Sequence, residues 1–159
     1  ASRCFDELEY LNIDVLGMKG KSRVINIPDD REQLWQQIEN VLRNPVIRRF
    51  VLREDMKLEK KAGISALCEY SLLSDNVYPT YAVTKKELKD SGVKVEKQVS
   101  ELEEIGCVVL ELGYFIDFLG KGFQDPLSVV LSLTGEEQEE ERVDISINEM
   151  LEEYVWSKD

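Results

Sequence analysis

The sequence of 159 residues predicts an α+β fold, and two patterns carry this prediction. Apolar residues recur at helical spacing in several segments, and between these segments lie short runs in which apolar and polar residues alternate, as they do in strands. The contents of hydrophobic residues (43%) and charged residues (33%) are those of an ordinary globular protein. We therefore expect a helical extension with a short β-run over residues 1–63, a central domain over 64–135, and an acidic segment with a strand and an amphipathic helix over 136–159.

The extension contains signals for three helices and one strand. Apolar residues in the segment 5–15 fit one face of a short helix, and residues 23–27 form the β-run. Asp29 or Asp30 can serve as the N-cap, and Gln33 follows Asp30 at the spacing of a capping box, so we predict a helix over 31–44. Asn44-Pro45 can end that helix and begin another, which we predict to run to Gly63.

The central domain is predicted to contain helices followed by a β-hairpin. We expect a helix over 64–73, a very short strand over 81–83, and a helix after Thr84, whose side chain can cap it with Glu87 as the reciprocal partner. A longer helix is predicted over 95–105 and ends at Gly106. Residues 107–119 then have strand character, and a turn over 120–126 leads to a return strand over 127–133.

This order of elements resembles that of the winged-helix superfamily. The segments TKKELKDSG (84–92) and VEKQVSELEEIGCVVLEL (95–112) are similar to its helix-turn-helix and first wing strand, and the resemblance covers residues 64–133. It implies that the helix over 95–105 is the one that would enter a DNA groove and that the return strand completes the wing. The resemblance thus extends the α+β prediction to a winged-helix-like domain.

The distribution of charge argues against DNA recognition by that helix. The net charge is −12, but residues 48–97 carry +3 and residues 98–159 carry −13. The predicted groove helix contains Glu101, Glu103 and Glu104, whose carboxylates would repel phosphates. We therefore expect the module to bind protein, with nucleic acid as a less favoured partner.

Three groups of residues are candidates for binding a partner. A basic face is predicted from one stripe of the helix that begins at Pro45 together with the lysines of the helix after Thr84. Its residues are Arg49, Arg53, Lys57, Lys60, Lys85, Lys86 and Lys89. An acidic face is predicted from Glu101, Glu104, Glu111 and Asp117, and the carboxy-terminal helix offers Met150, Tyr154 and Trp156. The alternatives are a solvated basic face with local ion pairs, coverage of the basic residues by the acidic run 136–141, and core packing of the terminal helix.

The residue types present exclude several kinds of chemistry. The chain has no histidine, so catalysis by imidazole and metal binding by histidine are excluded. None of its three cysteines forms a Cys-x-x-Cys pair, and Cys68 and Cys107 fit a role as small buried apolar residues in a reducing, intracellular compartment. We expect no enzyme activity, no metal and no cofactor, and no segment long and apolar enough to span a membrane.

Two functional hypotheses follow from these observations. The first is a non-catalytic, winged-helix-like module for protein–protein interaction within a larger transcription, replication or chromosome-associated assembly. The alternative is a small acidic inhibitor of the immunity type, which would neutralise a basic nuclease or DNA-binding protein by presenting carboxylates where that partner expects phosphates.

Overall fold

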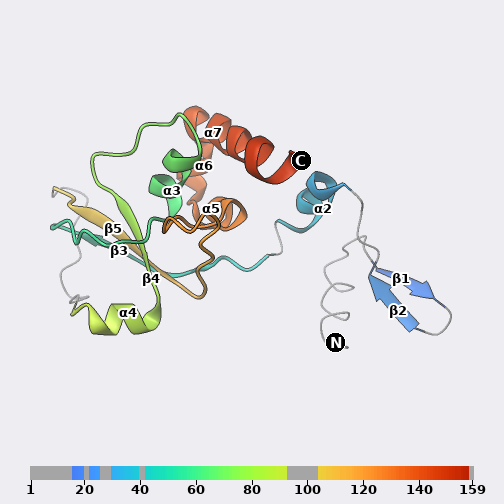
Figure 1. Ribbon diagram of the computed structural model, residues 1–159, viewed down its shortest axis with the longest axis horizontal. Coiled ribbons are helices and arrows are strands. Elements are labelled where there is room, and N and C mark those ends of the chain that lie inside the picture. Colours follow the sequence, from blue (N-terminus) through green and yellow to red (C-terminus); the bar gives the residue numbers. More distant parts are fainter. Residues whose placement is uncertain (1–15, 20–21, 26–29, 40–41, 93–103, 158–159) are drawn as a thin grey trace. The chain divides into compact units, whose positions relative to one another are not determined.

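The computed structural model describes residues 16–19, 22–25, 30–39, 42–92 and 104–157 (Figure 1). The chain divides into two compact units, residues 1–43 and residues 44–159. The predicted helix over 5–15, nearly all of the predicted helix over 95–105, and Glu101 lie outside the described residues. Helices and strands are both present, so the predicted α+β class is confirmed.

The first unit contains an antiparallel hairpin and a helix. Strand β1 (Leu16–Lys19) pairs with β2 (Ser22–Ile25), so the predicted β-run over 23–27 is confirmed in part. Helix α2 (Arg31–Ile38) begins after Asp30, whose carboxylate accepts hydrogen bonds from the backbone N–H groups of Glu32 and Gln33. The predicted N-cap is therefore confirmed.

A three-stranded sheet organises the second unit. Strand β5 (Cys107–Leu112) lies in the centre, antiparallel to β3 (Val46–Leu52) and parallel to β4 (Thr80–Val83). All six residues of β5 are buried, and each fully buried valine or leucine contributes about 1.5–3 kcal/mol. The predicted strands over 81–83 and at the start of 107–119 are confirmed.

Helices cover both faces of this sheet (Figure 1). Helix α4 (Lys85–Asp90) lies on one face, where Leu88 packs against Phe50, Val83 and Val109. On the other face lie α3 (Gly63–Tyr70), α5 (Pro126–Ser132) and α7 (Glu141–Leu151), which contact one another. Because side chains alternate along a strand, β5 supplies both cores.

The predicted helix over 45–62 is wrong, because residues 46–52 form β3 and residues 53–62 are not helical. The apolar residues Val46, Ile47, Phe50 and Val51 fit helical spacing, and this spacing does not exclude a strand in a short run. β-Branched and aromatic side chains favour a strand, and pairing with β5 buries Phe50 against the α4 face of the sheet.

The predicted return strand over 127–133 is also wrong. Asp125 accepts a hydrogen bond from the backbone N–H of Ser128, and Pro126 occupies the first turn, so these residues begin α5. A capping box between Thr134 and Glu137 then begins α6 (Gly135–Glu139). The predicted strand over 143–147 is part of α7. The hairpin expected as a wing is therefore not formed by these segments, and a winged-helix fold is not confirmed.

One buried polar side chain connects the helices to the sheet. Gln124 Oε1 accepts a hydrogen bond from the backbone N–H of Gly63 (3.1 Å), and Nε2 donates to Ser132 Oγ (2.8 Å). The backbone carbonyl of Gln124 accepts from the Tyr70 hydroxyl (2.9 Å). Ala62 provides no side-chain cap for α3, so Gln124 satisfies an N–H group at the start of that helix from 61 residues away.

We expect Gln124→Leu to lower the free energy of unfolding by about 2–4 kcal/mol, because the N–H of Gly63 and the hydroxyl of Ser132 each lose a buried partner. Chemical denaturation monitored by circular dichroism measures this change. The exposed Gln138 provides the matched control, and Gln138→Leu should cost under about 1 kcal/mol. Equal costs at the two positions would contradict this role of Gln124.

Candidate functional site

The predicted basic face is not a helix stripe, because its residues lie on β3 and the chain after it. Arg49 forms an ion pair with Glu137 at 3.2 Å, and Lys60 forms one with Glu87 at 2.6 Å. The first contact brings one member of the acidic run 136–141 onto a predicted basic residue. Arg53 and Lys57 are exposed in the segment that follows β3.

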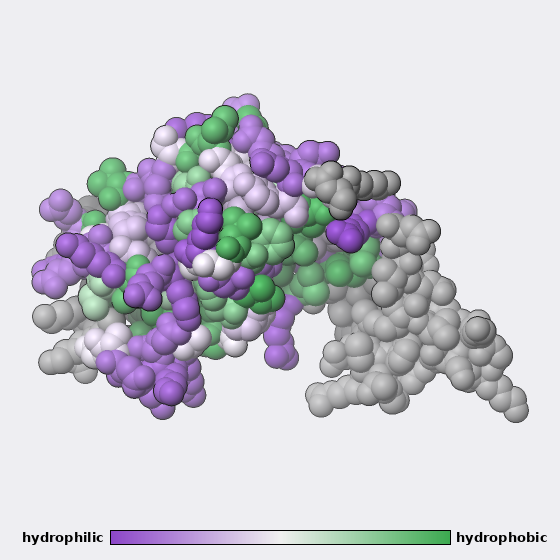
Figure 2. Space-filling view, viewed as in Figure 1, coloured by the Kyte–Doolittle hydropathy of each residue, from purple (hydrophilic) through white to green (hydrophobic). Residues whose placement is uncertain are grey.

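The lysines of α4 form the remaining part of the predicted basic group. Lys85, Lys86 and Lys89 are exposed on this helix, and Figure 2 shows hydrophilic residues over the region where Figure 1 places α4. Helix α4 has six residues, and Lys60 lies close to it through the ion pair with Glu87. The structure thus brings Lys60 close to the α4 helix that carries these lysines, without forming a continuous stripe.

The predicted acidic face does not assemble, because Glu111 is buried. Its exposed fraction is 1%, and its carboxylate accepts hydrogen bonds from Arg48 Nε (2.7 Å) and Nη2 (3.2 Å). The hydrogen bonds from Arg48 lower the pKa of Glu111, and the carboxylate raises the pKa of Arg48. Glu104 is exposed just before β5. Glu111 therefore has a structural role as the acceptor for Arg48.

Asp117 holds a surface loop in one conformation. Its carboxylate accepts hydrogen bonds from the backbone N–H groups of Lys121 (3.0 Å) and Gly122 (2.9 Å). The backbone N–H of Asp125 donates to the carbonyl of Ile116. Gly122 has φ +80°, and a Cβ atom there would meet the backbone of Glu59 at 3.0 Å. Asp117 is thus a loop-closing residue, and the loop is connected to its surroundings at several points.

This loop carries a group of exposed apolar side chains, and we call residues 114–119 the apolar loop. Ile116 is 53% exposed and Phe118 is 48% exposed, and Tyr114 and Leu119 are also exposed. Single exposed apolar residues are common on protein surfaces, whereas a group of them marks a contact surface. The apolar loop is therefore a candidate for binding another molecule.

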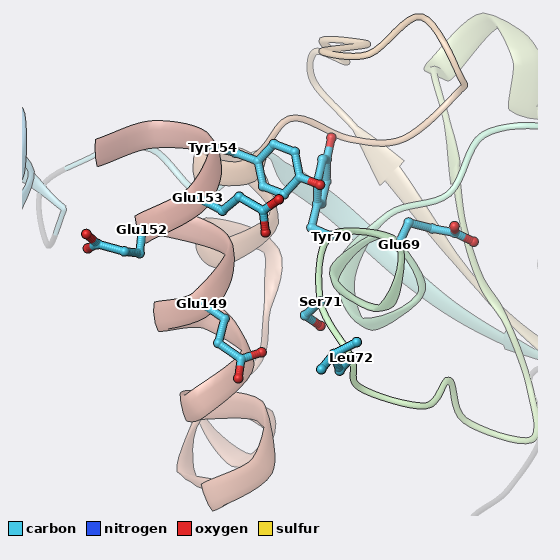
Figure 3. A pocket seen from close by; sticks show the side chains of 8 residues that line it. All are labelled: Glu69, Tyr70, Ser71, Leu72, Glu149, Glu152, Glu153 and Tyr154. Atoms are coloured by element: carbon cyan, nitrogen blue, oxygen red, sulfur yellow. The ribbon is translucent and has the colours of Figure 1, made fainter. Parts of the chain in front are cut away.

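A hollow of about 630 Å³ lies between the end of α3 and the carboxy-terminal helix (Figure 3). One side is formed by residues 69–72, and the other by Glu149 of α7 with Glu152, Glu153 and Tyr154 of the π-helical turn η1 (Glu152–Trp156). The rings of Tyr70 and Tyr154 meet edge to face with centroids 5.1 Å apart. This hollow combines aromatic and acidic groups.

The three predicted residues of the terminal helix have different environments. Met150 is fully buried against the core, so the prediction that it is available to a partner is wrong. Tyr154 is half-buried and lines the hollow, and Trp156 is half-buried in η1. The alternative of core packing thus holds for Met150, whose spacing with Val143 and Ile147 places all three on the buried side of α7.

The two cysteines in the described part of the chain are poor nucleophiles. Burial raises the pKa of the Cys68 thiol to about 12, with further increases from the charges of Asp75 and Glu69. Burial also raises the pKa of Cys107, whose Sγ donates to the carbonyl of Glu54. A thiol with a raised pKa holds little reactive thiolate at neutral pH.

Searches for other kinds of site cover the described ranges only. Within them, no group of three or more cysteine, aspartate or glutamate residues could hold a metal ion. No helix in the same ranges is long and apolar enough to cross a membrane. Comparison with protein-family models, with curated proteins and with solved structures finds no significant match. The surfaces themselves are therefore the basis for a functional proposal.

Prediction from the sequence missed the apolar loop and the hollow for different reasons. Residues 114–119 were assigned to a continuous strand, although Gly113 before them and Gly120 after them signal a loop. Glu152 and Glu153 lie within the predicted terminal helix and are exposed in the structure. The position of α3 beside them depends on long-range packing, for which no local signal exists.

We expect Arg48→Met to destabilise the protein more at pH 7 than at pH 4. With Arg48 present, the lowered pKa of Glu111 contributes stability above about pH 4.3, the value in the unfolded chain, and this is lost as pH falls. Without Arg48, the buried carboxylate has no bonded cation and retains only the weaker effect of the Lys85 charge, so its ionisation costs stability as pH rises. Thermal unfolding at the two pH values measures the difference.

Lys86→Met is the control for Arg48→Met, since it removes one exposed cation of α4. Its effect should be small and nearly the same at both pH values. The double variant Arg48→Met/Glu111→Leu should regain part of the lost stability, because no buried charge is left unpaired. If Arg48→Met behaved like Lys86→Met at pH 7, the ion pair would have no such role.

Proposed function

We propose that this protein is a non-catalytic module for protein–protein interaction, with the apolar loop as its principal contact surface. The observation that carries the proposal is the exposure of Ile116 and Phe118 on a loop held by the Asp117 carboxylate. Aromatic and large apolar side chains supply most of the binding energy at protein interfaces.

The hydrogen bonds within the loop support this proposal energetically. Ordering a flexible segment costs about 0.5–1.5 kcal/mol for each immobilised side chain, and a loop ordered before binding avoids part of that cost. The Ser128 hydroxyl also donates to the Tyr114 hydroxyl at 3.4 Å, which connects the start of the loop to α5. Ile116 and Phe118 are thus presented from a backbone that is already in place.

The biological setting remains part of the proposal. We propose a transcription, replication or chromosome-associated assembly on the basis of the resemblance of residues 84–112 to winged-helix proteins. Free Cys68 and Cys107 support an intracellular location, because reducing compartments keep thiols unpaired. Nucleic acid is a less favoured partner, since Lys60 and Arg49 are already paired with glutamates.

The alternative function, an acidic inhibitor of a basic protein, has support from a different observation. The hollow presents carboxylates beside two tyrosine rings at the end of α7. An inhibitor of this kind would use acidic groups to attract its target from a distance. Glu111 has no part in this alternative, because it is buried and bound to Arg48.

We expect Phe118→Asp and Ile116→Asp each to reduce capture of the partner at least about tenfold, because each change places a charge in an apolar contact. Tagged protein is used to capture partners from source-cell extract, and the captured proteins are quantified by mass spectrometry. A photo-crosslinking amino acid at position 118 should form a covalent adduct with the same partner.

Ile145→Asp is the matched control, because Ile145 is 51% exposed on α7 and lies outside the apolar loop. It should leave capture unchanged, and all three variants should retain the thermal stability of the wild-type protein. The proposal is wrong if the loop variants capture the same proteins in the same amounts, or if no protein crosslinks at position 118.

A further inference from the structure

We infer that the hollow between α3 and α7 is a second docking site, which takes an arginine or lysine side chain from a basic segment of a partner protein. The inference concerns a different surface from the apolar loop, so it stands or falls independently of the proposed function. Three features carry it: an apolar lining, two inward carboxylates and, among the residues that the structure describes, the absence of a cation that pairs with them.

The lining is apolar where a side chain would lie. Tyr70 and Tyr154 form one part, and Leu72, which is 95% exposed, forms another. The volume of about 630 Å³ lies within the range of ordinary binding sites. Arginine and lysine bury their aliphatic stems along such surfaces while the charged group remains in a polar position.

Two carboxylates face this space. Figure 3 shows the carboxylate of Glu149 directed toward Ser71 and Leu72, and that of Glu153 directed toward the tyrosine rings. The carboxylate of Glu152 points away, so the helix does not present all of its acidic groups to the hollow. Glu149 and Glu153 are four residues apart, and like charges at this spacing destabilise a helix.

No cation of the described chain compensates this pair. The salt bridges among the described residues do not include Glu149 or Glu153. Lys61, the cation beside the hollow, is bonded to Glu69 at 2.6 Å. The backbone also adopts a π-helical turn from Glu152 to Trp156, a rare conformation that is frequent at functional sites.

A guanidinium or ammonium group satisfies all of these features together. It forms charge-assisted hydrogen bonds with the two carboxylates, which removes their mutual repulsion. It also interacts favourably with the face of a tyrosine ring. Its stem packs on Leu72. The net charge of −13 over residues 98–159 would draw a basic segment toward this end of the chain.

The test measures binding of a fluorescent eight-residue peptide that contains two arginines flanked by leucine, serine and glycine. The control peptide has glutamine in place of both arginines. We expect the full-length protein to bind the arginine peptide, and Glu149→Gln/Glu153→Gln to weaken binding at least about tenfold. Leu72→Ser should weaken it several-fold through loss of contact with the stem.

Glu136→Gln/Glu139→Gln is the matched control, because it changes the net charge equally on exposed residues of α6. It should change the affinity by less than about twofold. Equal weakening by both pairs would show attraction to net charge alone and overturn the site. Equal binding of the two peptides, or no binding of either, would also overturn it. None of these outcomes affects capture through Phe118.

Discussion

The side chain of Gln124 joins parts of the second unit that are far apart in the sequence. It satisfies the first turn of α3 through Gly63, reaches Ser132 of α5, and accepts the Tyr70 hydroxyl through its own carbonyl. Gly63, the first residue of α3, has φ +53°, a conformation that favours glycine at this position. The position of α3 bears on both candidate surfaces. Tyr70 at its end lines the hollow. Gln124, which is bonded to the start of α3, belongs to the segment 123–125 that follows the apolar loop.

The basic residues in the middle of the chain form separate ion pairs with glutamates on other elements. Arg48 binds Glu111, Arg49 binds Glu137, and the neighbouring Lys60 and Lys61 bind glutamates on α4 and α3. Because of these contacts, the basic middle and the acidic end of the sequence do not form one basic face and one acidic face in the fold. The acidic groups of α7 and the lysines of α4 are among the charged groups that remain on the surface, and those of α7 allow the hollow to attract a basic segment.

Elements that are determined by residues close together in the sequence, such as capped helix starts, were predicted correctly. Asp30 and Thr84 cap their helices as expected, and the short strand β4 lies where it was predicted. Gly106 was predicted as a helix stop, whereas its essential role is close packing: a Cβ atom would lie 2.3 Å from the carbonyl oxygen of Arg53. The strand β3 and the helix α5 were mispredicted because their apolar residues fit both periodicities, and only pairing with β5 or the cap at Asp125 decides between them.

The candidate surfaces were harder to predict, and the reason is physical. A buried glutamate such as Glu111 has the same local sequence character as an exposed one, and its burial depends on Arg48, which lies 63 residues away. Met150 and Tyr154 lie on one helix, yet one enters the core and the other lines a hollow, because the winding changes from α to π between them. The two proposed contact surfaces therefore differ in what they would select: shape and apolar area at Phe118 on its closed loop, and positive charge at Glu149 and Glu153 in the hollow.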